Sequence, residues 1–243
     1  MSAKKKELLS ETAYRAIKNM ILTHRFAPGL RVNVEKLGRE LGVSRPPVWE
    51  AIRRLEQEGV LRKIPNRGVF MIENTLERLF EQVQIRGSLD ALAGALACKQ
   101  IDARILVQLS RCLTDQLQAI ENANLNAYSA ADLQFHRLIY EASGNVALKA
   151  FFESISLQMT TVPRNLNILP RLPSTFATHQ EMIEGLADRN EDLVQAAVGR
   201  HTQIILAHLE AEIRARIDRE EAVQRIKHRL GAVASSAEKK RGS

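Results

Sequence analysis

Cysteines are scarce in this 243-residue sequence, and long apolar runs are missing from it. Cys98 and Cys112 form neither a CxxC pair nor the spacing of a zinc finger, so we expect two buried, reduced thiols rather than a disulfide framework. No stretch of about 18 apolar residues occurs, so no transmembrane helix is predicted. The basic start is followed by an amphipathic segment, unlike a signal peptide, and we expect a cytoplasmic protein with no membrane partner.

Acidic residues are outnumbered by basic residues in the first third of the chain. Residues 1–74 contain 15 Lys and Arg against 8 Asp and Glu, whereas residues 75–243 contain 20 of each. The whole formal net charge of +7 therefore lies in the first 74 residues. A basic module joined to a neutral one indicates a polyanionic partner, such as nucleic acid, for the basic module alone.

The basic part predicts short helices followed by a β-hairpin. Gly42 and Ser44 suit a tight turn before the last of these helices, because glycine tolerates positive φ and the serine hydroxyl can cap a helix. The apolar segments 60–64 and 69–72 flank a turn that contains proline and glycine, which is typical of a hairpin. Apolar residues recur at helical spacing in three segments that end at chain-breaking residues: about 7–24, 34–41 and 45–58.

This order of elements predicts a winged helix-turn-helix, whose last helix enters the major groove of DNA with its N-terminus at the bases. Ser44, Arg45 and Trp49 lie at that N-terminus, and Arg45 can pair with guanine or with a phosphate. Lys36, near the start of the preceding helix, can hold the DNA backbone. Arg67–Gly68 at the hairpin tip suits a wing, because arginine fits a narrow minor groove.

The remainder of the chain is helical in pattern, with no convincing pair of strands. Pro163 predicts a kink or an early end in the fourth of its helices. The predicted fold class is mostly α, with a winged helix-turn-helix over 1–74, an all-α six-helix bundle over 75–220 and a basic, disordered tail over 221–243. The helical segments are about 76–99, 102–122, 125–142, 146–168, 174–188 and 191–217.

Histidines and an aspartate of the helical part have the spacing of a metal site. Asp132 and His136 are four residues apart and share one helix face. His179 and His201 each lie 11 residues from Asn190, in the turn between the last two helices, so they are level if these helices are antiparallel. Three imidazoles and one carboxylate suit zinc, nickel or manganese, with positions left for water or a ligand.

Spacing alone leaves other interpretations open. An Asp–His pair four residues apart is often a surface pair, and His208 shares a helix face with His201, so it is an alternative ligand. A bound metal can activate water, which makes a metal-dependent hydrolase the alternative function. No motif places a general base beside the ligands, and catalysis needs no DNA-reading domain, so we do not expect an enzyme. A purely structural metal, with the effector bound in another cavity, is a third possibility.

Three motifs resemble the N-terminal domain of GntR-family regulators: Glu40–Val48 (ELGVSRPPV), Glu50–Val60 (EAIRRLEQEGV) and Asn66–Phe70 (NRGVF). The resemblance covers about 65 residues and implies that four positions meet DNA: Lys36, Arg45, Arg53 and Gly68. Trp49 departs from the pattern, because the family usually has arginine there. The change removes one charged contact, and the indole can instead stack on a sugar or contact a thymine methyl group.

A second resemblance concerns the helical part. The segment Asp132–Asn145 (DLQFHRLIYEASGN), with His179 and His201 after it, is similar to the all-helical ligand-sensing FCD domain of FadR-type GntR regulators. Six rather than seven helices match its VanR branch, and the intact Asp/His set disfavours a metal-free acyl-CoA sensor. The resemblance implies a divalent transition metal, with zinc preferred over nickel or manganese, on four ligands: Asp132, His136, His179 and His201.

The same resemblance implies a role for Arg86. Family members commonly carry an arginine here that faces a cavity and pairs with an effector carboxylate, a task suited to the planar guanidinium. The alternative is a surface arginine paired with Glu81 or Asp90. The predicted function is therefore a DNA-binding regulator, in the repressor mode, that binds a palindromic operator as a homodimer. A small organic acid would control its operator affinity through the metal-containing domain.

Overall fold

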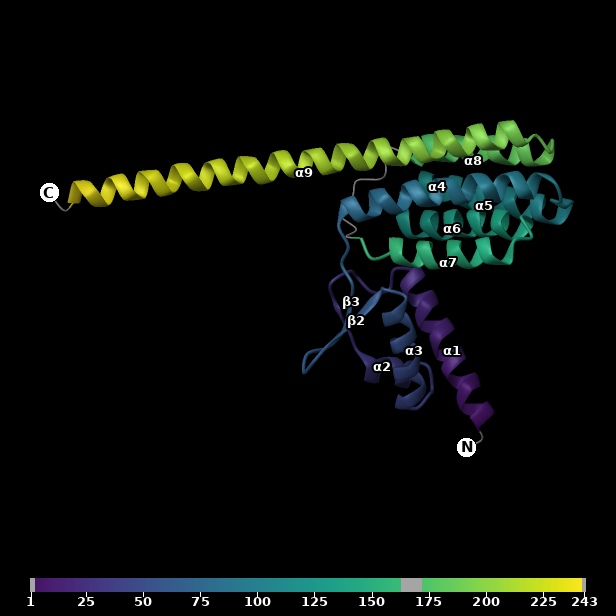
Figure 1. The fold of residues 1–243 in the computed structure, drawn as a ribbon, viewed down its shortest axis with the longest axis horizontal. Coiled ribbons are helices and arrows are strands. Elements are labelled where there is room, and N and C mark those ends of the chain that lie inside the picture. Colours follow the sequence, from purple (N-terminus) through teal and green to yellow (C-terminus); the bar gives the residue numbers. More distant parts are fainter. Residues whose placement is uncertain (1–2, 163–171, 242–243) are drawn as a thin grey trace.

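The computed structural model describes the backbone of residues 3–162 and 172–241 and the side chains of residues 8–162 and 172–224. A small winged domain carries a layered bundle of helices, and the last helix continues well beyond that bundle (Figure 1). The mostly α fold class is confirmed. Pro163 and the rest of 163–171 lie outside the described residues. Both cysteines are described, buried and unbridged, as predicted.

The winged domain has the predicted helices and hairpin and one strand more. Within the described residues its strands form an antiparallel sheet in the order β1-β3-β2. The strand missed by the sequence analysis, β1, has two residues, too few to show a periodic pattern. The elements are α1 (Ala3–Leu22), β1 (Arg31–Val32), α2 (Val34–Glu40), α3 (Arg45–Gln57), β2 (Leu61–Ile64) and β3 (Gly68–Met71).

Helices α1 and α3 supply most of the core of this domain. Val48, Ile52 and Leu55 recur at helical spacing on α3 and are almost completely buried. They belong to the same apolar cluster as Ile17 and Ile21 of α1. Complete burial of each such side chain stabilises the fold by about 1.5–3 kcal/mol, so this spacing fixes the orientation of α3 in the winged domain.

Ser44 occupies the N-cap position of α3, but its side chain makes no capping hydrogen bond, so that prediction was wrong. A capping hydroxyl accepts a hydrogen bond from the backbone N–H of the second or third helical residue. These residues are Pro46 and Pro47, which have no N–H. The hydroxyl is therefore not engaged by the start of the helix.

The helical domain has six helices within the described residues, as predicted: α4 (Leu76–Cys98), α5 (Ala103–Glu121), α6 (Leu125–Ala142), α7 (Val146–Met159), α8 (Leu172–Ala187) and α9 (Glu191–Arg241). The starts of five are fixed by side chains that accept a hydrogen bond from the backbone N–H three residues later, namely Thr75, Asp102, Asn124, Asn145 and Asn190. In the described part of the chain, no helix has the length and apolar character that crossing a membrane requires.

Helix α9 corrects the predicted end of the bundle. It runs to Arg241, whereas the sequence analysis ended this helix near residue 217 and expected disorder over 221–243. Residues 218–241 contain no proline and are rich in alanine, glutamate, lysine and arginine, which all favour helix. The basic composition of this segment, from which disorder was predicted, is therefore compatible with a helix that continues from the bundle.

Close packing holds α4, α8 and α9 together at two glycines. A Cβ atom on Gly94 of α4 would lie 2.5 Å from Cγ1 of Val194 in α9. A Cβ on Gly185 of α8 would lie 2.7 Å from Cγ2 of the same valine. Val194 therefore fills a space that exists because both facing residues lack a side chain.

Gly94→Ala is expected to lower the free energy of unfolding by about 1–3 kcal/mol, because the added methyl group collides with Val194 in a packed core. Gly199→Ala in α9 is the matched control, since among the described residues no atom outside its own stretch of helix lies within 4 Å of the added Cβ. The control should be unchanged or more stable by up to about 1 kcal/mol, because alanine favours helix. Urea denaturation followed by circular dichroism compares the two, and equal stabilities would contradict the close packing.

Candidate functional site

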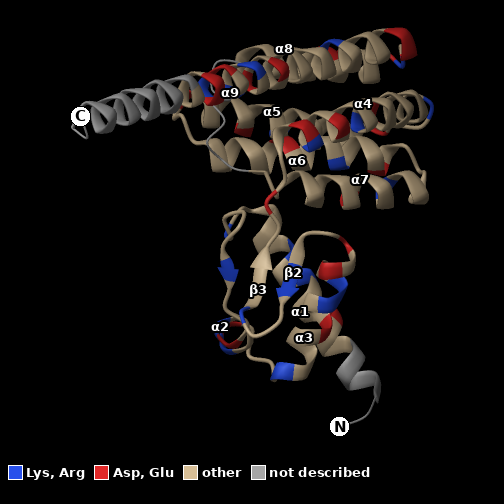
Figure 2. Cartoon of the chain, turned by 60° about the vertical axis from the view of Figure 1, so that its left-hand side comes forward, with Lys and Arg blue, Asp and Glu red and all other residues tan. Residues whose placement is uncertain are grey.

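The predicted DNA-facing side chains lie on the surface of the winged domain, where Figure 2 shows Lys and Arg on several elements. The Arg45 side chain is 74% exposed and forms an ion pair with Glu35 at 2.7 Å. Trp49 is 38% exposed, and Nζ of Lys63 lies 5.2 Å from the centre of its ring. Three further basic side chains of the set are also exposed: Lys36, Arg53 and Arg67.

Gly68 has a structural reason to be glycine. Its φ is +107°, a conformation that other residues rarely adopt. A Cβ there would lie 2.9 Å from Nε of Arg31, which packs across the start of β3. Arg31 is exposed and sits beside the wing, so it joins the candidate DNA contacts. The sequence analysis missed it because the short β1 was not recognised.

The structure brings three of the four predicted metal ligands together in the bundle core. His136 of α6, His179 of α8 and His201 of α9 are buried, and one nitrogen of each lies within 4.8 Å of the others. Asp132 lies at the edge of this cluster, with its Oδ1 3.7 Å from Nε2 of His179 and 4.0 Å from Nε2 of His136. Among the described residues, the cluster does not include His208, the alternative ligand.

The inward nitrogens of this cluster fit a metal ion. Nε2 of His136 and Nε2 of His179 are buried and make no hydrogen bond within the described part of the chain. Buried polar atoms are normally satisfied, and a cation accepts lone pairs from such nitrogens. The three imidazoles and the Asp132 carboxylate therefore form a donor set into which a divalent ion fits.

The outward nitrogens are held by side chains that sequence reasoning missed. Nδ1 of His179 lies 2.8 Å from Oε1 of Gln116, on α5. Nδ1 of His201 lies 2.9 Å from Oγ1 of Thr178, on α8. Such contacts fix the ring orientation of histidine ligands. Thr178 could have been noticed in the sequence because it directly precedes His179. Nothing in the sequence links Gln116 to this cluster.

Burial sets the charge state of the cluster. Desolvation lowers the pKa of His136 well below its usual value, and the positive charge of Arg86 lowers it further. Desolvation, with the same arginine, lowers the pKa of His179 to about 3. Both imidazoles are thus neutral near pH 7, which is the form that binds a metal.

Asp90 connects Arg86 to the cluster. Its carboxylate is buried, with Oδ2 lying 3.4 Å from Nε of Arg86 and 3.6 Å from Nδ1 of His136. The Tyr140 hydroxyl donates to Oδ1 at 2.7 Å. Burial raises the pKa of Asp90, and the Arg86 charge opposes this rise. The alternative pairing of Arg86 with Asp90 is therefore present, but Arg86 is only 13% exposed and is not a surface residue.

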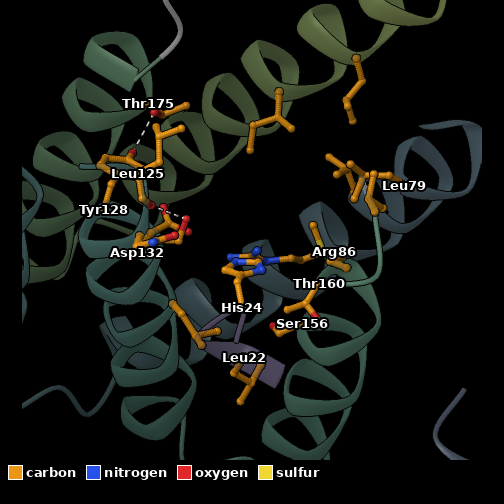
Figure 3. A pocket seen from close by; sticks show the side chains of 18 of the residues that line it. Leu22, His24, Leu79, Arg86, Leu125, Tyr128, Asp132, Ser156, Thr160 and Thr175 are labelled. Atoms are coloured by element: carbon orange, nitrogen blue, oxygen red, sulfur yellow. Dashed lines mark hydrogen bonds between the residues drawn. The ribbon is translucent and has the colours of Figure 1, made fainter. Parts of the chain in front are cut away.

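A cavity of about 800 Å³ opens beside the cluster and has the size of a small-ligand site (Figure 3). Arg86, Asp132 and His201 line it together with apolar side chains. Nη2 of Arg86 is buried and makes no hydrogen bond with any described residue. A charged donor and the edge of the histidine cluster thus share one cavity.

A basic winged helix-turn-helix joined to a helical domain is the organisation of a transcription regulator. Residues 9–71 match the family described as bacterial regulatory proteins, gntR family, and residues 81–204 match the FCD domain. The chain belongs to the GntR family and carries an FCD domain, as the sequence resemblance implied. It is a regulator rather than an enzyme, and the hydrolase alternative is not favoured.

Transcription regulators from other bacteria are similar to this chain over most of their length. The Nta operon transcriptional regulator of Aminobacter aminovorans is 31% identical over 184 residues, which cover 76% of this chain and 86% of that protein. The HTH-type transcriptional repressor RspR of Escherichia coli K12 is 23% identical, with 81% and 87% covered. The solved structure of E. coli McbR/YncC has the same fold, with a TM-score of 0.75 at 22% identity over 84% of this chain and 98% of that one.

Tyr140→Phe is expected to lower the free energy of unfolding by about 1–3 kcal/mol, because it removes a donor from a buried carboxylate. Asp90→Ala supplies the control background, in which the acceptor is absent. In that background, Tyr140→Phe should lower the free energy of unfolding by less. Urea denaturation of the two single variants and the double variant measures the difference. An equal cost in both backgrounds would show that this hydrogen bond does not stabilise the fold.

Proposed function

We propose that this GntR-family regulator binds a palindromic operator as a homodimer and that a small carboxylate effector controls its affinity. The effector would bind in the cavity of the helical domain, next to a divalent metal ion, with zinc the preferred ion. The observation that carries the proposal is the buried histidine cluster that meets the same cavity as Arg86. In the proposed mode of regulation, the protein represses its target genes and the effector relieves this repression. Because the target is bacterial DNA, we propose that the protein acts in the cytoplasm.

The metal part of the proposal rests on the donor set. Asp132, His136, His179 and His201 would hold the ion through three imidazole nitrogens and a carboxylate oxygen, a set suited to zinc. When bound, the ion supplies positive charge and room for a further anionic ligand. Gln116 would keep the His179 ring in the orientation in which its Nε2 points inward.

The effector part rests on Arg86. A guanidinium offers a planar fork of donors that matches a carboxylate, and Nη2 of Arg86 has no hydrogen bond to any described residue. Asp90 neutralises part of the charge of Arg86 in the unliganded protein and keeps the side chain in place. A small organic acid can therefore meet a fixed cation on one side of the cavity and the Asp132 edge of the cluster on another.

The DNA part assigns α3 to the major groove and the β2–β3 hairpin to the adjacent minor groove. Ser44, Arg45 and Trp49 would face base edges, and Lys36, Arg53, Arg67 and Gly68 would contact the backbone or the groove walls. A second copy would read the other half-site. Ile85 and Leu92 support a homodimer, because they lie seven residues apart on one face of α4 and are 57% and 48% exposed.

Removal of one ligand is expected to empty the metal site. Protein purified without chelator should contain about one transition-metal ion per chain by elemental mass spectrometry, and His136→Ala should contain none. His208→Ala is the control and should keep the metal, since His208 is outside the cluster. If the wild type contains no metal and also fails to bind added zinc, the metal part of the proposal is wrong.

Selection from a random duplex library at moderate salt is expected to enrich a palindromic sequence. Arg45→Ala should weaken binding to that DNA by about 1–3 kcal/mol, because it removes a contact to a base or phosphate. Arg104→Ala on α5 is the matched control, with a side chain 68% exposed against 74% for Arg45, and should bind as the wild type does. Fluorescence anisotropy measures both. Failure to enrich any sequence above nonspecific binding would overturn the proposed function.

A further inference from the structure

The cavity of the helical domain is lined in part by the DNA-binding domain. Leu22, at the end of α1, and His24, just after it, line the same cavity as Arg86 and Asp132. Figure 3 shows the His24 side chain reaching into this cavity from the end of α1. Ile21, next to Leu22, is completely buried in the core of the winged domain. The helix that supports α3 therefore also forms part of the cavity wall.

The backbone after α1 holds His24 in a fixed position. Its φ is +56°, in the left-handed region that glycine adopts more readily. The N–H of His24 donates to the carbonyl of Ile21, and the N–H of Arg25 donates to the carbonyl of Met20, both at 2.8 Å. These bonds close the end of the helix in the manner of a left-handed cap. His24 therefore moves with α1 as one body.

The end of α7 forms a second link between the cavity and the DNA-binding domain. Leu157 is completely buried in the core of the winged domain. Nε2 of Gln158 donates at 3.2 Å to the carbonyl of Glu58, the C-cap residue directly after α3. Ser156 and Thr160 of the same stretch line the cavity instead. One helical turn thus contacts the end of the recognition helix on one side and the cavity on the other.

We propose that His24 and Leu22 are effector-contacting residues, so that an effector touches the DNA-binding domain directly and shifts its position. A ligand in this cavity that contacts His24 binds more tightly to one placement of α1 than to another. By linkage, that placement changes the affinity for DNA. The proposal rests on the proposed function, since it takes this cavity as the effector site. The new element is that effector binding would reach the DNA-binding domain through the cavity wall formed by α1 and the end of α7.

A tethered anion tests this without knowledge of the natural effector. His24→Cys, treated with a methanethiosulfonate reagent that adds a 2-sulfonatoethyl group, carries a small anion at the cavity wall. The affinity for the selected operator DNA should change by at least about fivefold, and a reducing agent should restore it. Thr23→Cys is the matched control, because Thr23 is the exposed neighbour and does not line the cavity. Its operator affinity should not change.

Mass spectrometry measures the modification, and the wild type checks that the buried Cys98 and Cys112 do not react. Equal changes at positions 23 and 24, no change after complete modification of His24→Cys, or a thiol at position 24 that does not react would each overturn the inference. Leu22→Cys, from the same wall, should behave like His24→Cys and replaces it if that variant does not fold. A wild type that selects no DNA contradicts the proposed function instead, so the two failures are distinguishable.

Discussion

Three imidazoles buried in the centre of a helical bundle are the constraint on which the rest of the helical domain depends. Each ring comes from a different helix, so α6, α8 and α9 must keep their relative heights for the nitrogens to converge. Val194, seated against Gly94 and Gly185, keeps α4, α8 and α9 at the short separation that this requires. The packing of small residues and the geometry of the polar cluster are therefore two aspects of one arrangement.

Polar contacts then extend this constraint outward in a chain. His136 faces Asp90, Asp90 faces Arg86, and Arg86 reaches the cavity. Beyond the cavity lie the end of α1 and the last turn of α7, which contact the core of the winged domain. A continuous set of contacts thus joins the histidine cluster to the helices that position α3.

The elements and ligands that could be predicted from the sequence are those with a local period. The four-residue spacing of Asp132 and His136, and the equal distance of His179 and His201 from Asn190, follow from helix geometry and a short turn. Gln116 could not be predicted, because its helix carries no motif and meets the cluster only after folding. Asp90 was predicted only as a possible partner of Arg86, and its place beside His136 depends on how α4 packs against α6. The failed cap at Ser44 was deducible from Pro46 and Pro47, whereas the role of His24 depends on how two domains pack.

The sequence contains a single tryptophan, and it lies on the exposed side of α3. All of the indole fluorescence of the protein therefore arises at one position, Trp49, beside the amine of Lys63. An indole that stacks on a sugar or meets a base changes its emission, so an unlabelled sample can report DNA contact optically. The departure from the arginine usual at this position thus gives the protein an intrinsic spectroscopic probe at the surface assigned to DNA.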